Sequence, residues 1–170
     1  TFQGNPKAVK GCQKHDMRKS LYIVGGAGRG KTHLIAAQAR ELVKAGNYNF
    51  YFISAARLFD LLAGAAFNHD DREGTEYEIL KRCTNVEILF LDDLGQHGAS
   101  NWIISKLYLI IDQRYSNDRP VIITSNFDLN GLQARLGDPI ASRLAEGKII
   151  RLTGSDYRRR RNTKDQIKKF

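Results

Sequence analysis

Short apolar runs alternate along the chain with stretches in which apolar residues recur every three or four positions. The runs predict buried strands, and the helical spacing predicts helices that each pack on one face. The predicted strands cover residues 21–24, 49–53, 86–91, 121–124 and 148–152. Because strands that alternate with helices form parallel sheets covered on both faces, the pattern predicts an α/β domain.

Helices are predicted between these strands, over residues 31–45, 55–62 and 76–83, with a fourth after residue 93. Gly46 is expected to end the first helix, and Ser54 to cap the second. Residues 64–75 are rich in Gly, Asn and Asp, which predicts a loop. The fourth helix is expected to bury one apolar face, formed by Ile104, Leu107, Tyr108, Ile111 and Tyr115.

Length and composition fit one globular domain. The 170 residues are 42% hydrophobic and 26% charged, which excludes a wholly disordered chain. No apolar run reaches the roughly 18–20 residues that a membrane-spanning helix needs, so we expect no membrane segment. Cys12 and Cys83 form no disulfide framework, and the C-x-x-H spacing of Cys12 and His15 is only half a metal site. We therefore expect a cytoplasmic protein without a structural metal.

The segment between the first strand and the first helix matches a phosphate-binding motif. Residues 25–32 satisfy G-x-x-x-x-G-K-[ST] in the strand-to-helix context that gives this pattern its meaning. Backbone N–H groups of such a loop converge on phosphate oxygens, and the helix N-terminus adds partial positive charge. We expect Lys31 to contact the β- and γ-phosphates and the Thr32 hydroxyl to ligate Mg²⁺; a glycine-rich turn is the alternative. The residues expected at the nucleotide are Gly25, Gly26, Ala27, Gly28, Arg29, Gly30, Lys31, Thr32 and His33.

Two later strands end in polar residues that complete such a site. The third strand delivers Asp92 and Asp93 to its carboxyl end, where ligands bind in open α/β sheets. Asp92 is expected to hold Mg²⁺ through water, and Asp93 to polarise the attacking water. Asn126, after the fourth strand, could orient that water or sense the γ-phosphate. A helix-capping turn at the aspartates and a plain turn at residues 125–128 are the alternatives.

These motifs, together with Ala-Ser-Arg-Leu at 141–144 and Ser-Asp-Tyr-Arg at 155–158, resemble AAA+ ATPases of the DnaC/DnaI-type helicase loaders. DnaA initiators and IstB transposition ATPases are related to that group. The resemblance implies a P-loop NTPase fold, a three-layer αβα sandwich around a parallel sheet, with ATP or ADP and Mg²⁺ as cofactors. It also implies that Arg143 is an arginine finger for a neighbouring subunit and Arg158 a sensor arginine acting in cis. Ordinary surface or salt-bridged arginines are the alternatives.

The resemblance divides the chain into a linker near the adenine (1–20), an ATPase core (21–157) and a basic tail (158–170). Because little chain follows Arg158, we expect the helical lid to be absent or minimal. We also expect Thr1 to begin an isolated ATPase domain or a phage-like minimal relative. Asp93 stands where many AAA+ proteins have glutamate, which predicts slow turnover.

The net charge of +9 is concentrated at the two ends of the chain. Residues 1–20 carry +4 and residues 151–170 carry +6, whereas residues 21–150 carry −1. The basic end predicts either a solvated tail or contact with DNA phosphates. Residues 55–85 mix cations and aromatics with acidic residues, which predicts weak, salt-sensitive binding of single-stranded DNA.

Three functions remain open. The first is a slow, partner-stimulated ATPase that assembles with its own kind, with a hexameric replicative helicase and with single-stranded DNA. The second is a transposition helper ATPase, which would carry the same motifs. The third is a nucleotide-gated adaptor with negligible hydrolysis.

Overall fold

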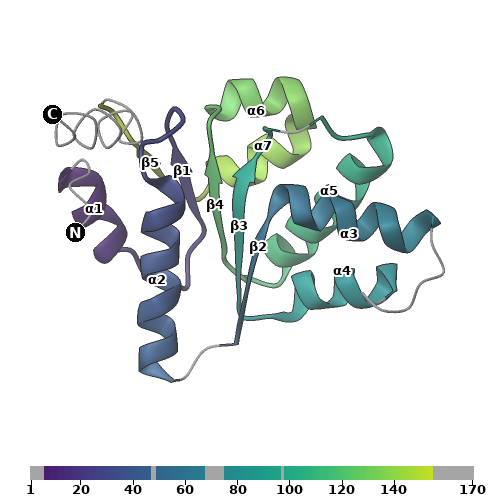
Figure 1. Ribbon diagram of the computed structural model, residues 1–170, viewed down its shortest axis with the longest axis horizontal. Coiled ribbons are helices and arrows are strands. Elements are labelled where there is room, and N and C mark those ends of the chain that lie inside the picture. The colour runs from purple at the N-terminus through teal and green to yellow at the C-terminus, as the bar shows by residue number, and fades with distance from the viewer. Residues whose placement is uncertain (1–5, 47–48, 68–74, 97, 155–170) are drawn as a thin grey trace, which may run out of the picture.

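The computed structural model describes residues 6–46, 49–67, 75–96 and 98–154. A five-stranded parallel sheet with strand order β2-β3-β4-β1-β5 forms its centre (Figure 1). The strands are β1 (Leu21–Val24), β2 (Phe50–Ser54), β3 (Ile88–Leu94), β4 (Val121–Ser125) and β5 (Lys148–Arg151). The helices of the described residues are α1 (Pro6–Gln13), α2 (Lys31–Ala45), α3 (Ala55–Phe67), α4 (Glu76–Asn85), α5 (Asn101–Ser116), α6 (Leu129–Leu136) and α7 (Asp138–Ala145).

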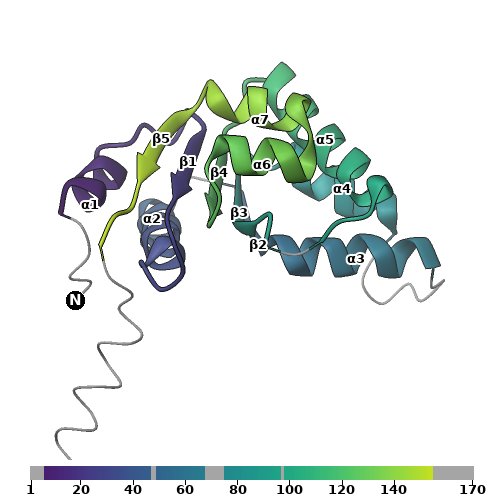
Figure 2. The same ribbon diagram turned by 90° about the horizontal axis from the view of Figure 1, so that it is seen from above.

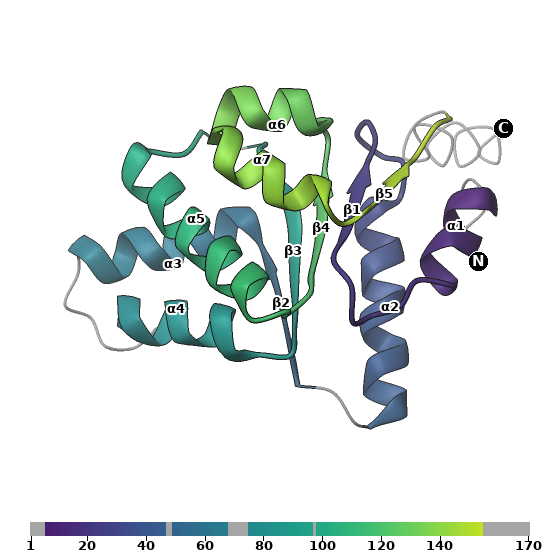
Figure 3. The ribbon, with the colours of Figure 1, turned by 180° about the vertical axis from the view of Figure 1, so that it is seen from behind.

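Two hydrophobic cores, one on each face of the sheet, give the molecule three layers. Leu21 and Ile23 face the core formed with α1 and α2, whereas Tyr22 and Val24 face the core formed with α3–α7. This alternation is the period-two pattern of a strand that is buried on both faces. Figures 2 and 3 show α1 and α2 grouped beside β1 and β5, and α3–α7 grouped over the rest of the sheet. The predicted αβα sandwich is therefore confirmed.

All five predicted strands and all four predicted helices are present; β1 and α2 have the predicted bounds, and the ends of other elements differ. Residues 64–67, predicted as loop, continue α3 instead, because the Ala-rich stretch favours helix and Ala65 packs on the core. The Ser54 hydroxyl does cap α3, accepting a hydrogen bond from the Arg57 backbone N–H at 3.2 Å. β3 extends through both aspartates to Leu94.

Three helices were not predicted from the sequence. α1 lies within the segment predicted as a linker, where it packs on α2 and β5. α6 begins at residues that were read as a possible turn, and the Asp128 carboxylate accepts a hydrogen bond from the Gly131 N–H at 2.9 Å. α7 follows Gly137 and carries Arg143. The last two helices are short, so their apolar spacing is hard to detect in the sequence.

The buried face of α5 differs in part from the predicted one. Leu107 and Ile111 are buried as expected, but Tyr115 is 49% exposed and Arg114 takes its place in the interior. The Arg114 guanidinium donates hydrogen bonds to backbone carbonyls of Cys83 (2.8 Å), Val86 (3.0 Å), Glu87 (3.0 Å) and Pro120 (2.6 Å). Burial lowers the pKa of Arg114 to about 10, and these carbonyls make the buried charge tolerable.

Among the described residues, none of the helices combines the length and apolar character needed to cross a membrane.

Candidate functional site

The loop over residues 25–32 connects β1 to α2 at the carboxyl edge of the sheet. Gly28 (φ 68°) and Gly30 (φ 82°) adopt left-handed backbone conformations that side chains with a Cβ disfavour. A Cβ at Gly25 would lie 2.8 Å from both Cβ and the carbonyl oxygen of Leu152. These glycines therefore let the chain wrap tightly against the end of β5. Ala27 is exposed, and so is His33 on the first turn of α2.

Arg29 and Lys31 have different roles in this loop. The Arg29 guanidinium donates a hydrogen bond to the Leu152 carbonyl at 3.0 Å, which fastens the loop to the chain after β5. Lys31 is only 7% exposed, and its Nζ donates to the carbonyls of Gly25 (2.7 Å) and Gly26 (3.1 Å). The same ammonium donates to Asn126 Oδ1 at 2.5 Å, so it joins the loop to the end of β4.

The two residues expected to hold Mg²⁺ are in direct contact. Thr32 Oγ1 donates to Asp92 Oδ1 (3.0 Å) and Oδ2 (2.9 Å). The Thr124 hydroxyl, on β4, donates to Asp92 Oδ1 at 2.5 Å and accepts the Asp93 N–H at 2.9 Å. A hydroxyl and a carboxylate, both hard oxygen ligands, thus converge at the first turn of α2, and this donor set fits Mg²⁺.

Asp93 lies in a strained part of β3. Its φ of 60° is in the left-handed region, and the pairing of β3 with β4 shifts register between Leu91 and Leu94. Such strain costs on the order of 1–3 kcal/mol and is common at functional sites. The Asn126 amide donates to Asp93 Oδ1 at 3.4 Å and also to Gln96 Oε1. A chain of hydrogen bonds therefore runs from Lys31 through Asn126 to Asp93.

Sequence analysis missed two members of this cluster. Thr124 was noted only as part of a strand ending, although its hydroxyl connects both aspartates. Gln96 follows the aspartates in a loop where no periodic pattern indicates which side chain turns inward. A polar residue just beyond an Asp-Asp strand end is the only signal that the sequence offered.

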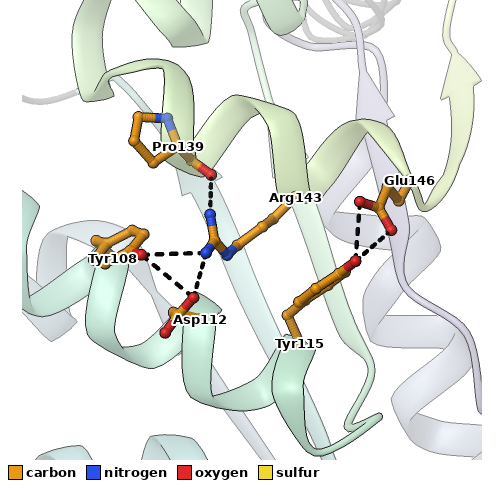
Figure 4. Close-up of polar contacts among 6 residues, drawn as sticks. All are labelled: Tyr108, Asp112, Tyr115, Pro139, Arg143 and Glu146. Atoms are coloured by element: carbon orange, nitrogen blue, oxygen red, sulfur yellow. Dashed lines mark hydrogen bonds and ion pairs between the residues drawn. The ribbon is translucent and has the colours of Figure 1, made fainter.

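The two predicted arginines lie apart from this cluster or outside the described residues. Arg143, on α7, contacts residues of α5 and α7 in the described part of the chain, and no hydrogen bond joins it there to the loop over 25–32 (Figure 4). Its salt bridge to Asp112 matches the alternative considered for it from the sequence. Arg158, with the predicted tail, lies outside the described residues.

Residues 5–165 match the model of a protein family described as IstB-like ATP binding protein. The chain belongs to this family. The match covers the loop over 25–32, both aspartates, Asn126 and Arg143. Membership in the IstB-like ATP-binding family confirms the predicted resemblance to AAA+ ATPases and assigns ATP as the nucleotide that the family binds.

Relatives of this chain include a protein of a phage-like element and DNA replication proteins. It is 28% identical to the phage-like element PBSX protein XkdC of Bacillus subtilis, over 85% of this chain and 58% of that protein. It is 26% identical to the replicative helicase loader DnaC of Escherichia coli K12, over 89% of this chain and 65% of DnaC. The chain therefore spans less than two thirds of either relative. A crystal structure of DnaI matches with a TM-score of 0.69 and 29% identity, covering 86% of this chain and 81% of DnaI.

Proposed function

We propose that this chain binds ATP with Mg²⁺, hydrolyses it slowly, and serves as the ATPase domain of a replicative helicase loader. The observation that carries the proposal is the convergence of Lys31, Thr32 and Asp92 with the hydrogen-bonded pair Asp93–Asn126. A cation, oxygen ligands and a carboxylate beside a phosphate-binding loop are the groups that phosphoryl transfer requires.

The loop and Lys31 would hold the phosphates. The ammonium already lies inside the loop, where it donates to the carbonyls of Gly25 and Gly26. Phosphate oxygens would become its acceptors when a nucleotide binds, and backbone N–H groups at the start of α2 would add further donors. Because Lys31 is nearly buried, its interaction with phosphate would be only weakly screened by solvent.

Thr32 and Asp92 would hold Mg²⁺. Their contact distances of 2.9–3.0 Å bring the hydroxyl and the carboxylate to one point. Bound there, the ion would neutralise charge on the β- and γ-phosphates. The Thr124 hydroxyl keeps Asp92 oriented and ties it to the backbone of Asp93.

Asp93 would orient the attacking water and accept its proton. Its carboxylate is reached by the Asn126 amide, whose oxygen accepts from Lys31. Asn126 would thereby sense the γ-phosphate and link Lys31, which contacts that phosphate, to Asp93, which handles the water. Loss of the γ-phosphate would change both contacts, which makes the nucleotide a switch for assembly.

Arg143 would act on the ATP of a neighbouring subunit, since its contacts are with α5 rather than with its own phosphate-binding loop. Arg158 would act in cis.

The similarity to DnaC and DnaI supports a hexameric replicative helicase as the partner. Weak binding of single-stranded DNA is supported by a cavity of about 500 Å³ beside β2, whose lining includes Tyr51, Arg57 and Arg82.

The second candidate is a transposition helper ATPase, and the match to the IstB-like family model favours it. The chemistry at Lys31, Asp92 and Asp93 would be the same, and only the client protein would differ. Co-purification with a replicative helicase, as opposed to a transposase, separates the two candidates.

Multiple-turnover phosphate release tests the proposed activity. We expect slow release with ATP and Mg²⁺ that rises when single-stranded DNA and a hexameric helicase are added. Phosphate release in the same buffer without the protein sets the background, and a fluorescent ATP analogue reports binding independently. Binding without release above that background in any condition would refute the enzyme and leave a nucleotide-gated adaptor.

A further inference from the structure

The guanidinium of Arg143 is held against its own chain by a cluster of side chains from α5 (Figure 4). Nη2 forms an ion pair with Asp112 Oδ1 and a hydrogen bond to the Tyr108 hydroxyl at 3.2 Å. Nη1 donates to the Pro139 carbonyl at 3.1 Å. The Tyr108 hydroxyl lies 3.4 Å from the same Asp112 oxygen, so these three side chains form a closed triangle.

The faces of the guanidinium are covered as well. Its carbon lies 4.9 Å from the centre of the Tyr108 ring and 5.7 Å from the centre of the Tyr115 ring, both within the range of cation–π attraction. The Arg143 side chain is consequently only 24% exposed. A finger that reaches a phosphate on another subunit needs its Nη groups free, and here both already have acceptors on the same chain.

Tyr115 is itself fixed from the far side. Its hydroxyl donates to the Glu146 carboxylate at 2.9 and 3.1 Å, just beyond the end of α7. This carboxylate raises the pKa of Tyr115 above its ordinary value, which already keeps the hydroxyl protonated at neutral pH, so the hydroxyl is a donor there. The two tyrosines and Asp112 therefore form a prepared site for the Arg143 guanidinium rather than a chance surface contact.

We propose that Asp112 is a positioning residue that holds the Arg143 finger on its own chain until the γ-phosphate of a neighbour's ATP replaces the carboxylate. The proposal rests on the proposed trans role of Arg143. Both acceptors are anionic oxygens that suit the guanidinium, and the phosphate carries the larger charge. Assembly then depends on which nucleotide the neighbour holds.

The held conformation weakens assembly in a predictable way. If only a fraction of chains has the finger released, the apparent dissociation constant of the assembly rises by the inverse of that fraction. Asp112→Asn keeps the shape of the side chain and removes its charge. It should therefore release the finger more often and tighten ATP-dependent self-association.

Sedimentation of the chain over a range of concentrations, in ATP and in ADP, measures this effect directly. We expect Asp112→Asn to lower the half-maximal concentration for self-association in ATP by about 1.5-fold to fivefold, the range for a partly exposed ion pair. No shift is expected in ADP, and the hydrolysis rate at saturating protein should stay at the wild-type value. Asp118→Asn, which removes the same charge just beyond α5, is the matched control.

A second pair of variants separates positioning from a general effect on folding. Tyr108→Phe keeps the ring and removes only the hydroxyl, so it should shift the half-maximal concentration in the same direction by a smaller factor. In an Arg143→Ala background Asp112→Asn should have no effect. An unchanged or raised half-maximal concentration, or a shift that persists without Arg143, would overturn the role of Asp112.

Measurements on Arg143→Ala and Asp112→Asn separate the role of Asp112 from the trans role of Arg143. If Arg143→Ala leaves hydrolysis unchanged, the trans finger itself is wrong. If Arg143→Ala lowers hydrolysis but Asp112→Asn leaves self-association unchanged, only the role of Asp112 fails.

Discussion

The phosphate-binding edge of the sheet and the α5–α7 surface around Arg143 are built in opposite ways. At the edge, Lys31, Asp92 and Asn126 come from segments far apart in the chain and converge on one point. At the α5–α7 surface, neighbours within the same chain accept hydrogen bonds from both Nη groups of one arginine. The side chains of the first region converge around the loop that we propose binds ATP. In the second region, the Arg143 guanidinium is bound by residues of its own chain.

If Arg143 acts in trans as proposed, one chain would carry half of each of two active sites. A complete site would combine the edge of one subunit with the α5–α7 surface of the next. Removing a residue from one region should therefore leave the role of the other region unchanged, whether that role is ATP binding or the supply of Arg143.

The largest effect is expected at Lys31. Lys31→Ala should abolish ATP binding, because the loop loses the nearly buried ammonium that we propose contacts the phosphates. Titration with a fluorescent ATP analogue measures the affinity. Lys44→Ala, at an exposed ion pair on the same helix, is the control and should bind normally. Normal affinity in Lys31→Ala would refute the phosphate-binding assignment.

The next largest effect is expected at Arg143, on hydrolysis alone. Arg143→Ala should keep ATP affinity within about twofold and lower the rate of phosphate release by on the order of 10³, as for other arginine fingers. The exposed Arg40 on α2 supplies a matched Arg→Ala control. A large loss of affinity would place Arg143 in the binding site of its own chain and remove the distinction between the two regions.

A smaller loss of rate is expected at Asp93. Asp93→Asn should lower hydrolysis by about 10² while ATP still binds, since it removes the proton acceptor and leaves Lys31 and Asp92 in place. Single-turnover phosphate release is the measurement. Asparagine also tolerates the left-handed backbone at this position, which limits side effects on folding. Hydrolysis at the wild-type rate would assign the water to another residue.

The smallest effect is expected at Tyr115. Tyr115→Phe keeps the ring over Arg143 and loses the hydrogen bond to Glu146, so the free energy of unfolding should fall only slightly, because this bond is exposed to solvent. Urea denaturation measures this change. ATP affinity should be unaffected, and a change there would mean that the two regions are coupled within one chain.

The same contrast explains what could be predicted from the sequence. The convergence of Lys31, Asp92 and Asn126 could be predicted, because the loop motif and the Asp-Asp strand end are local patterns with a fixed chemical meaning. The roles of these residues toward ATP stay predictions. Arg143 was identified only by resemblance, and its partners Tyr108 and Asp112 lie on another helix, where no motif indicates the contact.

Tertiary packing accounts for the remaining differences. Arg114 is a charged residue that a sequence pattern assigns to the surface, yet backbone carbonyls from α4 and from the residues just before β3 and β4 surround it. Arg114 is buried where Tyr115 was predicted to be, and Tyr115 lies beside α7, whereas the other residues of the predicted face pack on the core. Gln96 likewise joined the site through a loop conformation that propensities do not encode.

Mixing two inactive variants tests the central claim most directly. Lys31→Ala chains cannot bind ATP but offer Arg143, and Arg143→Ala chains bind ATP but offer no finger. We predict that each variant alone hydrolyses ATP at background rate and that an equimolar mixture regains hydrolysis well above either. A mixture as inactive as its components would contradict a site completed by the arginine of a neighbouring subunit.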